Sequence, residues 1–196
     1  SYTSNVDFDG YLADIQIVDG VALTANDFGE TRDTDGVWVP KEYSRTSVND
    51  GTVWSSKGSG GALANYPETN GFDGTTSTWF YASTSGTTTF TFNTPITGTK
   101  FEIFALSGGN WPEISVDGTG IGTHNSVWVD VSSQAGGSLS TIACPGTGSS
   151  QSGFAAVRVD GEILIDGFNN SSGYGRNGAH LNFSDSSTNQ ALGYDS

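Results

Sequence analysis

The chain has 196 residues, of which 34% are hydrophobic and 12% aromatic, enough to build hydrophobic cores and to exclude a disordered chain. Its formal net charge of −14 and its pI near 4.1 make nucleic acids and anionic membranes poor partners. No stretch has the apolar length of a transmembrane helix, so membrane insertion is not expected. Because the chain contains no Met, we expect it to be a processed or excised piece of a longer protein.

Asp-Gly pairs recur along the chain and predict tight hairpins, because both residues tolerate the positive φ that a type I′ turn requires. The eight pairs begin at Asp9, Asp19, Asp35, Asp50, Asp73, Asp117, Asp160 and Asp166. Most of them stand beside a short run of alternating apolar residues. The pattern predicts an all-β protein, an antiparallel β-sandwich or jelly roll with at most one short helical turn.

Residues 1–44 are predicted to form an N-terminal segment of strands around that helical turn. The alternation in 11–18 predicts a strand with one buried face made of Tyr11, Ala13, Ile15 and Ile17. Thr24 followed by Asp27 has the spacing of a capping box, and Gly29 is expected to end the turn. Trp38 is expected to act as an apolar anchor, and Pro40 limits its strand to a sheet edge.

Residues 45–167 contain clean period-two strands and are predicted to form a separate sandwich of seven or eight strands. Phe90 and Phe92 alternate with threonines, which predicts an aromatic face toward the core and a polar face toward solvent. The most strongly indicated hairpin spans Ala156–Asp166. The single cysteine, Cys144, is expected to be a small buried strand residue rather than a nucleophile.

Residues 168–196 contain one predicted strand, His180–Ser184, with Leu181 and Phe183 facing inward. Neither this segment nor residues 1–44 can form a core alone. We therefore expect the two to pair with each other, or with a neighbouring subunit, as a second and smaller β unit.

These outer segments carry a resemblance to known proteins. The run FDGYLADIQIVDGVALTANDFGE at 8–30, continuing to GVWVPKEY at 36–43, resembles a module of structural and tail-appendage proteins of marine bacteriophages. Its closing strand is similar to the last strand of laminin-G or concanavalin-like jelly rolls. The runs GRNGAHLNFSDS at 175–186 and ALGYD at 191–195 resemble the first strand of the same module.

The order of these matches is reversed relative to one complete jelly roll, and the middle strands are missing. The resemblance therefore implies a non-enzymatic virion structural protein, such as a tail fibre, an appendage or a capsid decoration. Other copies, or other virion proteins, would complete its strands in a homo-oligomer or filament of the virion or the extracellular space. The contact would use Tyr11, Ile15, Ile17, Leu181 and Phe183.

The run NGFDGTTSTW at 70–79 resembles the opening of discoidin-like, galactose-binding jelly rolls. In that family the turn often holds a structural calcium, and loops at one end of the sandwich contact sugars. The resemblance implies that Asp73 and Thr78 are Ca²⁺ ligands. The alternative is that Asp73 only closes an Asx turn.

Sugar binding by a sandwich needs an exposed aromatic ring beside polar groups, since rings stack on the C–H faces of sugars. The loop at 108–113 is the best candidate, with Trp111 between Asn110 and Glu113, and Tyr81 is the second. Trp111 could equally serve in packing. The alternative function is thus a carbohydrate-binding or host-receptor adhesion module that holds a cell-surface glycan.

The sequence offers little for catalysis. His124 and His180 are the only histidines, neither has the spacing of a zinc site, and no Gly-x-Ser-x-Gly elbow is present. With 21 acidic residues, some carboxylates will always lie close together, so a pair alone would not indicate a glycosidase. We therefore expect that this chain is not an enzyme.

Overall fold

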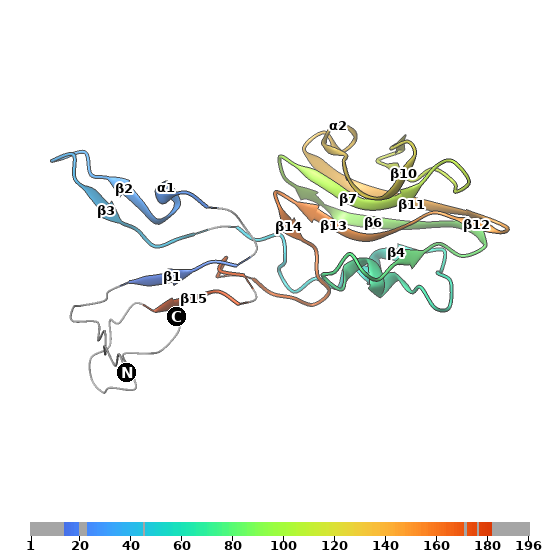
Figure 1. Ribbon diagram of the computed structural model, residues 1–196, viewed down its shortest axis with the longest axis horizontal. Helices are drawn as coiled ribbons and strands as arrows, with labels where there is room; N and C mark the ends of the chain where they lie inside the picture. The colour runs from blue at the N-terminus through green and yellow to red at the C-terminus, as the bar shows by residue number, and fades with distance from the viewer. Residues whose placement is uncertain (1–13, 20–22, 45, 171, 176, 182–196) are drawn as a thin grey trace, which may run out of the picture. The chain divides into compact units, whose positions relative to one another are not determined.

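The computed structural model describes residues 14–19, 23–44, 46–170, 172–175 and 177–181 (Figure 1). The chain divides into two compact units: unit 1, residues 1–45 with 172–196, and unit 2, residues 46–171. Both are built from antiparallel strands, which confirms the all-β prediction. No helix within the described ranges is long and apolar enough to cross a membrane.

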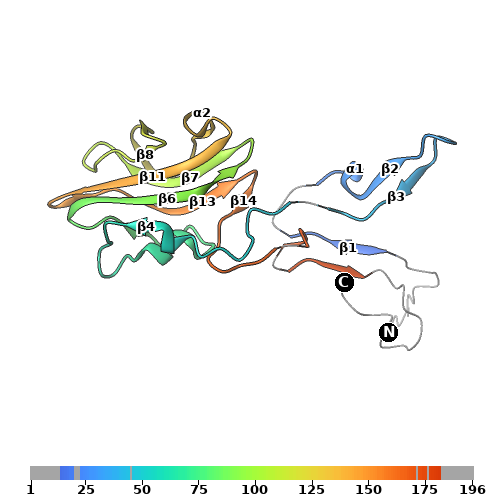
Figure 2. The ribbon, with the colours of Figure 1, turned by 180° about the vertical axis from the view of Figure 1, so that it is seen from behind.

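Unit 2 is a sandwich of two sheets. The six-stranded sheet has the order β4 (Gly58–Ser59), β6 (Ser85–Thr97), β11 (Ser138–Thr147), β8 (Ser115–Val116) and β9 (Thr119–Gly120), with β12 (Ser150–Gln151) also paired to β11. Figure 2 shows β8 beside β11. The five-stranded sheet has the order β10 (His124–Asp130), β7 (Phe101–Ser107), β13 (Gly153–Val159) and β14 (Glu162–Ile163), with β5 (Phe80–Tyr81) also paired to β13.

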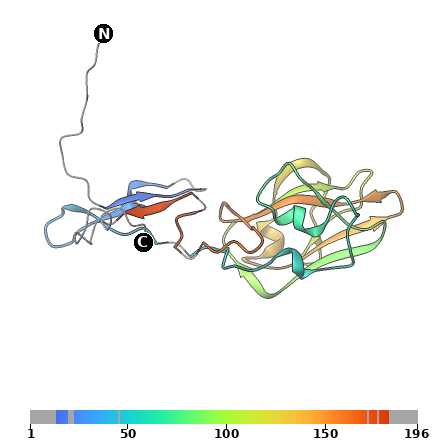
Figure 3. The same ribbon diagram turned by 90° about the horizontal axis from the view of Figure 1, so that it is seen from below.

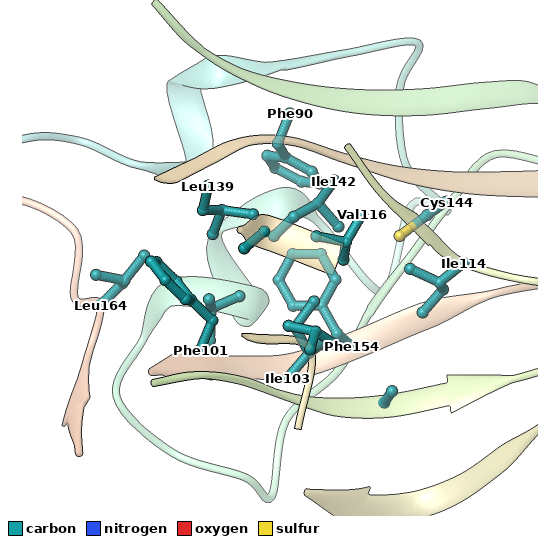
Figure 4. Packing of buried hydrophobic residues seen from close by; sticks show 14 of the residues in the cluster. Phe90, Phe101, Ile103, Ile114, Val116, Leu139, Ile142, Cys144, Phe154 and Leu164 are labelled. Carbon is teal, nitrogen blue, oxygen red and sulfur yellow. The ribbon is translucent and has the colours of Figure 1, made fainter. Parts of the chain in front are cut away.

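The core of unit 2 lies between these sheets, and side chains from both point toward one another (Figure 4). Phe90 and Phe92 on β6 face inward as predicted, whereas Thr91 between them is exposed. The centre is aromatic: the Phe154 ring lies 5.3 Å from those of Phe80 and Phe90, centroid to centroid. Cys144 is fully buried on β11, and burial raises the pKa of its thiol, so the expected strand position is confirmed.

Two of the Asp-Gly pairs form the predicted two-residue hairpin loops. Asp160 and Gly161 have φ of 49° and 85° between β13 and β14, and Asp117 and Gly118 have φ of 47° and 79° between β8 and β9. The Asp73 pair does not form such a loop, because Asp73 has φ −91° at the end of a 3₁₀ helix. An Asp-Gly pair therefore marks a positive φ at glycine more reliably than it marks a hairpin.

The expected helical turn is α1 (Ala25–Phe28), and the Asp27 carboxylate accepts from the amide of Thr24 at 2.7 Å. Three further short segments occur that were not expected: α2 (Ser132–Ala135) and the 3₁₀ helices η1 (Ser55–Lys57) and η2 (Glu68–Phe72). Each is too short to show a helical period in the sequence. The expectation of at most one helical turn was therefore too low.

Unit 1 contains two ribbons of two strands each within the described residues. β1 (Ile15–Ile17) pairs with β15 (Ala179–Leu181), and these blue and red strands lie side by side in Figure 3. β2 (Gly29–Thr31) pairs with β3 (Trp38–Pro40) in a two-stranded sheet, so the strand that contains Pro40 is an edge strand, as expected. The pairing of residues 15–17 with 179–181 joins the two ends of the sequence in one unit.

The two ends of unit 2 also meet. Asp50 and Asn169 form an antiparallel bridge. The amide of Gly51 donates to the carbonyl of Phe168 at 2.9 Å, and the amide of Asn170 donates to that of Asn49 at 2.8 Å. The chain therefore enters and leaves unit 2 at neighbouring positions.

Candidate functional site

The loop at 108–113 presents Trp111 on the surface of unit 2, with 38% of the residue exposed. The Trp111 amide donates to the Gly108 carbonyl at 3.0 Å, which closes the turn. Glu113 Oε1 accepts from the Gly122 amide at 2.7 Å, so this carboxylate anchors the loop to residues 120–123. Asn110 is exposed beside Trp111. The loop thus brings together three of the four residues predicted for sugar contact.

Tyr81, the fourth of them, belongs to a different surface. Its ring lies 6.0 Å from that of Trp79, with the two planes within 8° of parallel, and 4.8 Å from that of Tyr66. Burial, and secondarily Tyr66, raises the pKa of the Tyr81 phenol, so its hydroxyl stays protonated at neutral pH. Trp79 is half-buried and does not join the core cluster.

The rings continue across the five-stranded sheet. Trp79 lies 5.6 Å from Phe104 on β7, and Phe104 lies 5.5 Å from Trp128 on β10. We call these five residues, Tyr66, Tyr81, Trp79, Phe104 and Trp128, the aromatic row. The sequence did not predict it as a site, because Tyr66 and Trp79 stand in irregular segments. Residues 101–104 alternate between core and outward-facing positions, and this alternation could have placed Phe104 on the outer face.

Charged side chains stand at the Trp128 end of the row. The Arg158 guanidinium lies 4.0 Å from the centroid of the Trp128 ring and donates to both oxygens of Glu102, at 2.5 and 2.7 Å. Lys100 Nζ lies 3.1 Å from Glu102 Oε1. Glu102 is only 6% exposed, and the hydrogen bonds from Arg158 hold its pKa below the ordinary value. The two cations therefore cover a buried carboxylate.

Asp73 and Thr78, the predicted calcium ligands, are in contact. The Thr78 hydroxyl donates to Asp73 Oδ2, and the Thr75 amide donates to Asp73 Oδ1 at 3.0 Å. This is the Asx-type turn that was the alternative interpretation. No group of three or more His, Cys, Asp and Glu side chains that could hold a metal ion occurs in the part of the chain described. Calcium at Asp73 remains a prediction.

The predicted assembly residues Ile15, Ile17 and Leu181 lie on one face of the β1–β15 ribbon, and Ile15 is paired with Leu181. Tyr11 and Phe183 are outside the described residues. Ile17 is 53% exposed, so the expectation that it would be buried is wrong. Leu181 is half-buried, whereas its neighbour His180 is buried. The ribbon therefore turns its polar face inward.

The inward face is held by polar contacts. Gln16 Nε2 donates to the Lys41 carbonyl at 3.1 Å, and Gln16 Oε1 accepts from the Tyr43 amide at 2.6 Å. His180 Nε2 lies 2.6 Å from Asp14 Oδ1, and the His180 ring stacks on Tyr174 at 5.6 Å. Successive side chains of a strand point to opposite faces. Because Gln16 and His180 make these polar contacts on the inner face, Ile15 and Ile17 lie on the other face.

The second histidine, His124, starts β10, and its Nε2 lies 2.6 Å from the carbonyl of Ile121. Both histidines therefore have structural contacts.

Searches against protein-family models, curated proteins and solved structures each find no match to this chain.

Proposed function

We propose that this chain is a non-enzymatic structural protein of a virion that assembles through unit 1, where strands of neighbouring subunits complete one another. The observation that carries the proposal is the orientation of the β1–β15 ribbon, which turns its polar face inward and its apolar face outward. The virion setting itself rests on the sequence resemblance of residues 8–43 and 175–195. Copies of the same chain are the partner that we propose first.

The ribbons of unit 1 support assembly by their size. A two-stranded ribbon is marginal in water, and stable sheets need more strands or a covering layer. Each ribbon in the described part of unit 1 has two short strands. An added strand would gain main-chain hydrogen bonds at the open edge, and its alternating side chains would set the register.

Apolar exposure in unit 1 points the same way. Besides Ile17, the β2–β3 hairpin exposes half of Val37 and 48% of Trp38. Ile15, Ala179 and Leu181 extend the apolar face around Ile17 and are only half-buried. Burial of apolar surface in a contact between subunits stabilises it by about 25 cal/mol per Å² before the costs of association.

Sedimentation velocity of the full chain over a wide concentration range tests this assembly. We expect concentration-dependent association, which the Ile17→Asp substitution abolishes because a carboxylate would have to be buried in the contact. The matched control is Val127→Asp, which changes a valine of similar exposure on β10 in unit 2. This variant is expected to associate like the wild type.

A chain that stays monomeric and folded at the highest concentration would refute self-assembly. Loss of association in the Val127 variant, with association retained in the Ile17 variant, would move the contact to unit 2 and equally refute the proposal.

The second candidate is a carbohydrate-binding or host-receptor adhesion module. It is favoured by the anchored loop at 108–113, which holds a half-exposed Trp111 next to Asn110. Loss of glycan binding in Trp111→Ala, on a glycan array, would support that loop as the site. Unchanged binding would exclude it.

A further inference from the structure

We propose that the outer face of the five-stranded sheet in unit 2 is a binding platform for a neutral carbohydrate chain, which stacks along the aromatic row. The inference develops the second candidate function at a site other than the loop of Trp111. It does not depend on assembly through unit 1.

Strand alternation places the row on the outer face. On β7, Phe101, Ile103 and Ala105 belong to the buried core, so Glu102 and Phe104 face outward. On β10 the core residue is Val129, which puts Trp128 on the same outer side, directly opposite Phe104 in the register. On β5, Phe80 is buried and Tyr81 is its outward neighbour. The row is therefore separate from the core between the two sheets.

The spacing of the rings suits an extended ligand. Four successive ring centroids are 4.8, 6.0, 5.6 and 5.5 Å from the next one along the row. The rings are partly open to solvent, and Tyr66 at one end is 41% exposed. Aromatic faces bind the C–H faces of sugars, and polar groups beside them take the hydroxyls. Only the Trp79 and Tyr81 planes are nearly parallel, at 8°, while the other neighbouring rings are inclined by 43° or 71°, so the row offers separate contacts along its length rather than one flat surface. Separate contacts suit a chain rather than one sugar unit.

The end of the row supplies the polar groups. Arg158 has five N–H donors, and only its Nε and Nη2 bind Glu102. Stacking on Trp128 and the bidentate pair with Glu102 hold the guanidinium in one orientation. The Lys100 side chain is 53% exposed and adds a second cationic donor. These donors can reach ring and hydroxyl oxygens of a sugar stacked near Trp128.

The charged side chains around the aromatic row favour a neutral ligand. Lys100 and Arg158 contact Glu102, and Asp130 lies opposite Glu102 in the register, so the formal charges of these four side chains sum to zero. Residues 46–171 carry three Lys or Arg against ten Asp or Glu, and two of these cations are at the row. The Trp128 end of the row therefore carries less net negative charge than the rest of this acidic unit, even with the nearby Asp160 counted. An anionic polymer that extends beyond it would meet repulsion within a Debye length.

Isothermal titration calorimetry of the full chain with neutral hexasaccharides tests the platform. The probes are cellohexaose, xylohexaose and mannohexaose, with a hexamer of galacturonic acid as the charged comparison. We expect binding of at least one neutral hexasaccharide, with a shift in tryptophan emission. Trp79→Ala, which removes the central ring, is expected to weaken that binding about tenfold.

Three further variants keep this test decisive. Tyr66→Ala alters only the exposed end of the row and is expected to fold, so a smaller loss of affinity there supports the platform even if Trp79→Ala unfolds. Val53→Ala is the matched control, since it removes an exposed apolar side chain of unit 2 outside the row and outside the loop at 108–113, and its affinity is expected to equal that of the wild type. Trp111→Ala distinguishes the row from that loop. Thermal unfolding of each variant confirms that the fold is intact.

Three results would overturn the inference. The first is that no neutral hexasaccharide binds at millimolar concentration. The second is tighter binding of the galacturonic acid hexamer than of any neutral one. The third is a loss of binding in the Trp111 variant with none in Tyr66→Ala, which would place the sugar on the loop instead.

Discussion

Gln16 and Tyr43 are joined as two strands of a sheet would be, but through a side chain. Gln16 Oε1 accepts from the Tyr43 amide at 2.6 Å, while Gln16 Nε2 donates to the carbonyl of Lys41 at 3.1 Å. One primary amide thus satisfies a backbone acceptor and a backbone donor two residues apart. It links β1 to the segment that follows β3.

Substitution of Gln16 by Leu keeps the volume of the side chain but leaves both backbone groups without this partner. We expect a loss of local stability of about 1 to 3 kcal/mol, the cost of leaving such groups unsatisfied. Hydrogen exchange at the Tyr43 amide measures it directly, and that amide should exchange faster. Gln134→Leu is the control, since that side chain bonds to the exposed hydroxyl of Ser133. Unchanged exchange at Tyr43 would contradict the prediction.

Phe154 is the centre of the core of unit 2, with the rings of Phe72, Phe80 and Phe90 within 5.5 Å of its own. Phe154→Ala is expected to lower the free energy of unfolding by about 3 to 5 kcal/mol, because the cavity cannot collapse among close-packed rings. Urea denaturation measures the loss. Phe104→Ala, on the outer face, should cost clearly less; equal losses would contradict the assignment of inner and outer faces.

Glu102 links stability to pH. Hydrogen bonds from Arg158 lower the pKa of Glu102 in the folded state, so the stability it contributes is present above its unfolded pKa, near 4.3. That contribution is lost as the pH falls through the lower folded value. Glu102→Gln should therefore lower the free energy of unfolding by about 2 kcal/mol at pH 7, and by much less at a pH below the folded pKa of Glu102. Urea denaturation at both pH values checks this, and a constant difference would refute it.

Asp160 combines a positive φ of 49° with hydrogen bonds that fix the neighbouring loop. Its Oδ1 accepts from the Thr99 hydroxyl at 2.6 Å and from the Lys100 amide at 2.8 Å. Asp160→Ala loses these bonds and places a less suitable residue at positive φ, so we expect a loss of about 2 to 3 kcal/mol. Asp160→Asn should cost less, since Asn tolerates this backbone conformation. Thermal unfolding compares the two, and a reversed order would contradict the explanation.

Local patterns in the sequence predict much of unit 2. The alternation around Phe90 and the Asp160-Gly161 pair each depend on neighbours in the chain, and the structure has both as expected. The β1–β15 pairing, by contrast, joins residues far apart, and it follows only from the argument that neither end can form a core alone.

The sites show where such patterns fail. Alternation predicts that Ile15 and Ile17 share a face, but it does not say which face the fold covers. In unit 1, Gln16 and His180 turn inward because backbone groups and Asp14 are there to bind them. The aromatic row escaped prediction for a related reason. Its members come from two irregular segments and three strands, and only the folded sheet brings them into line.

The bridge between Asp50 and Asn169 has a consequence for how such a protein can change. A globule whose entry and exit points are adjacent can be inserted into a loop of another protein, or removed from it, without stretching the host. Exchange of unit 2 would then leave the strands of unit 1 intact, so the two units could diverge at different rates.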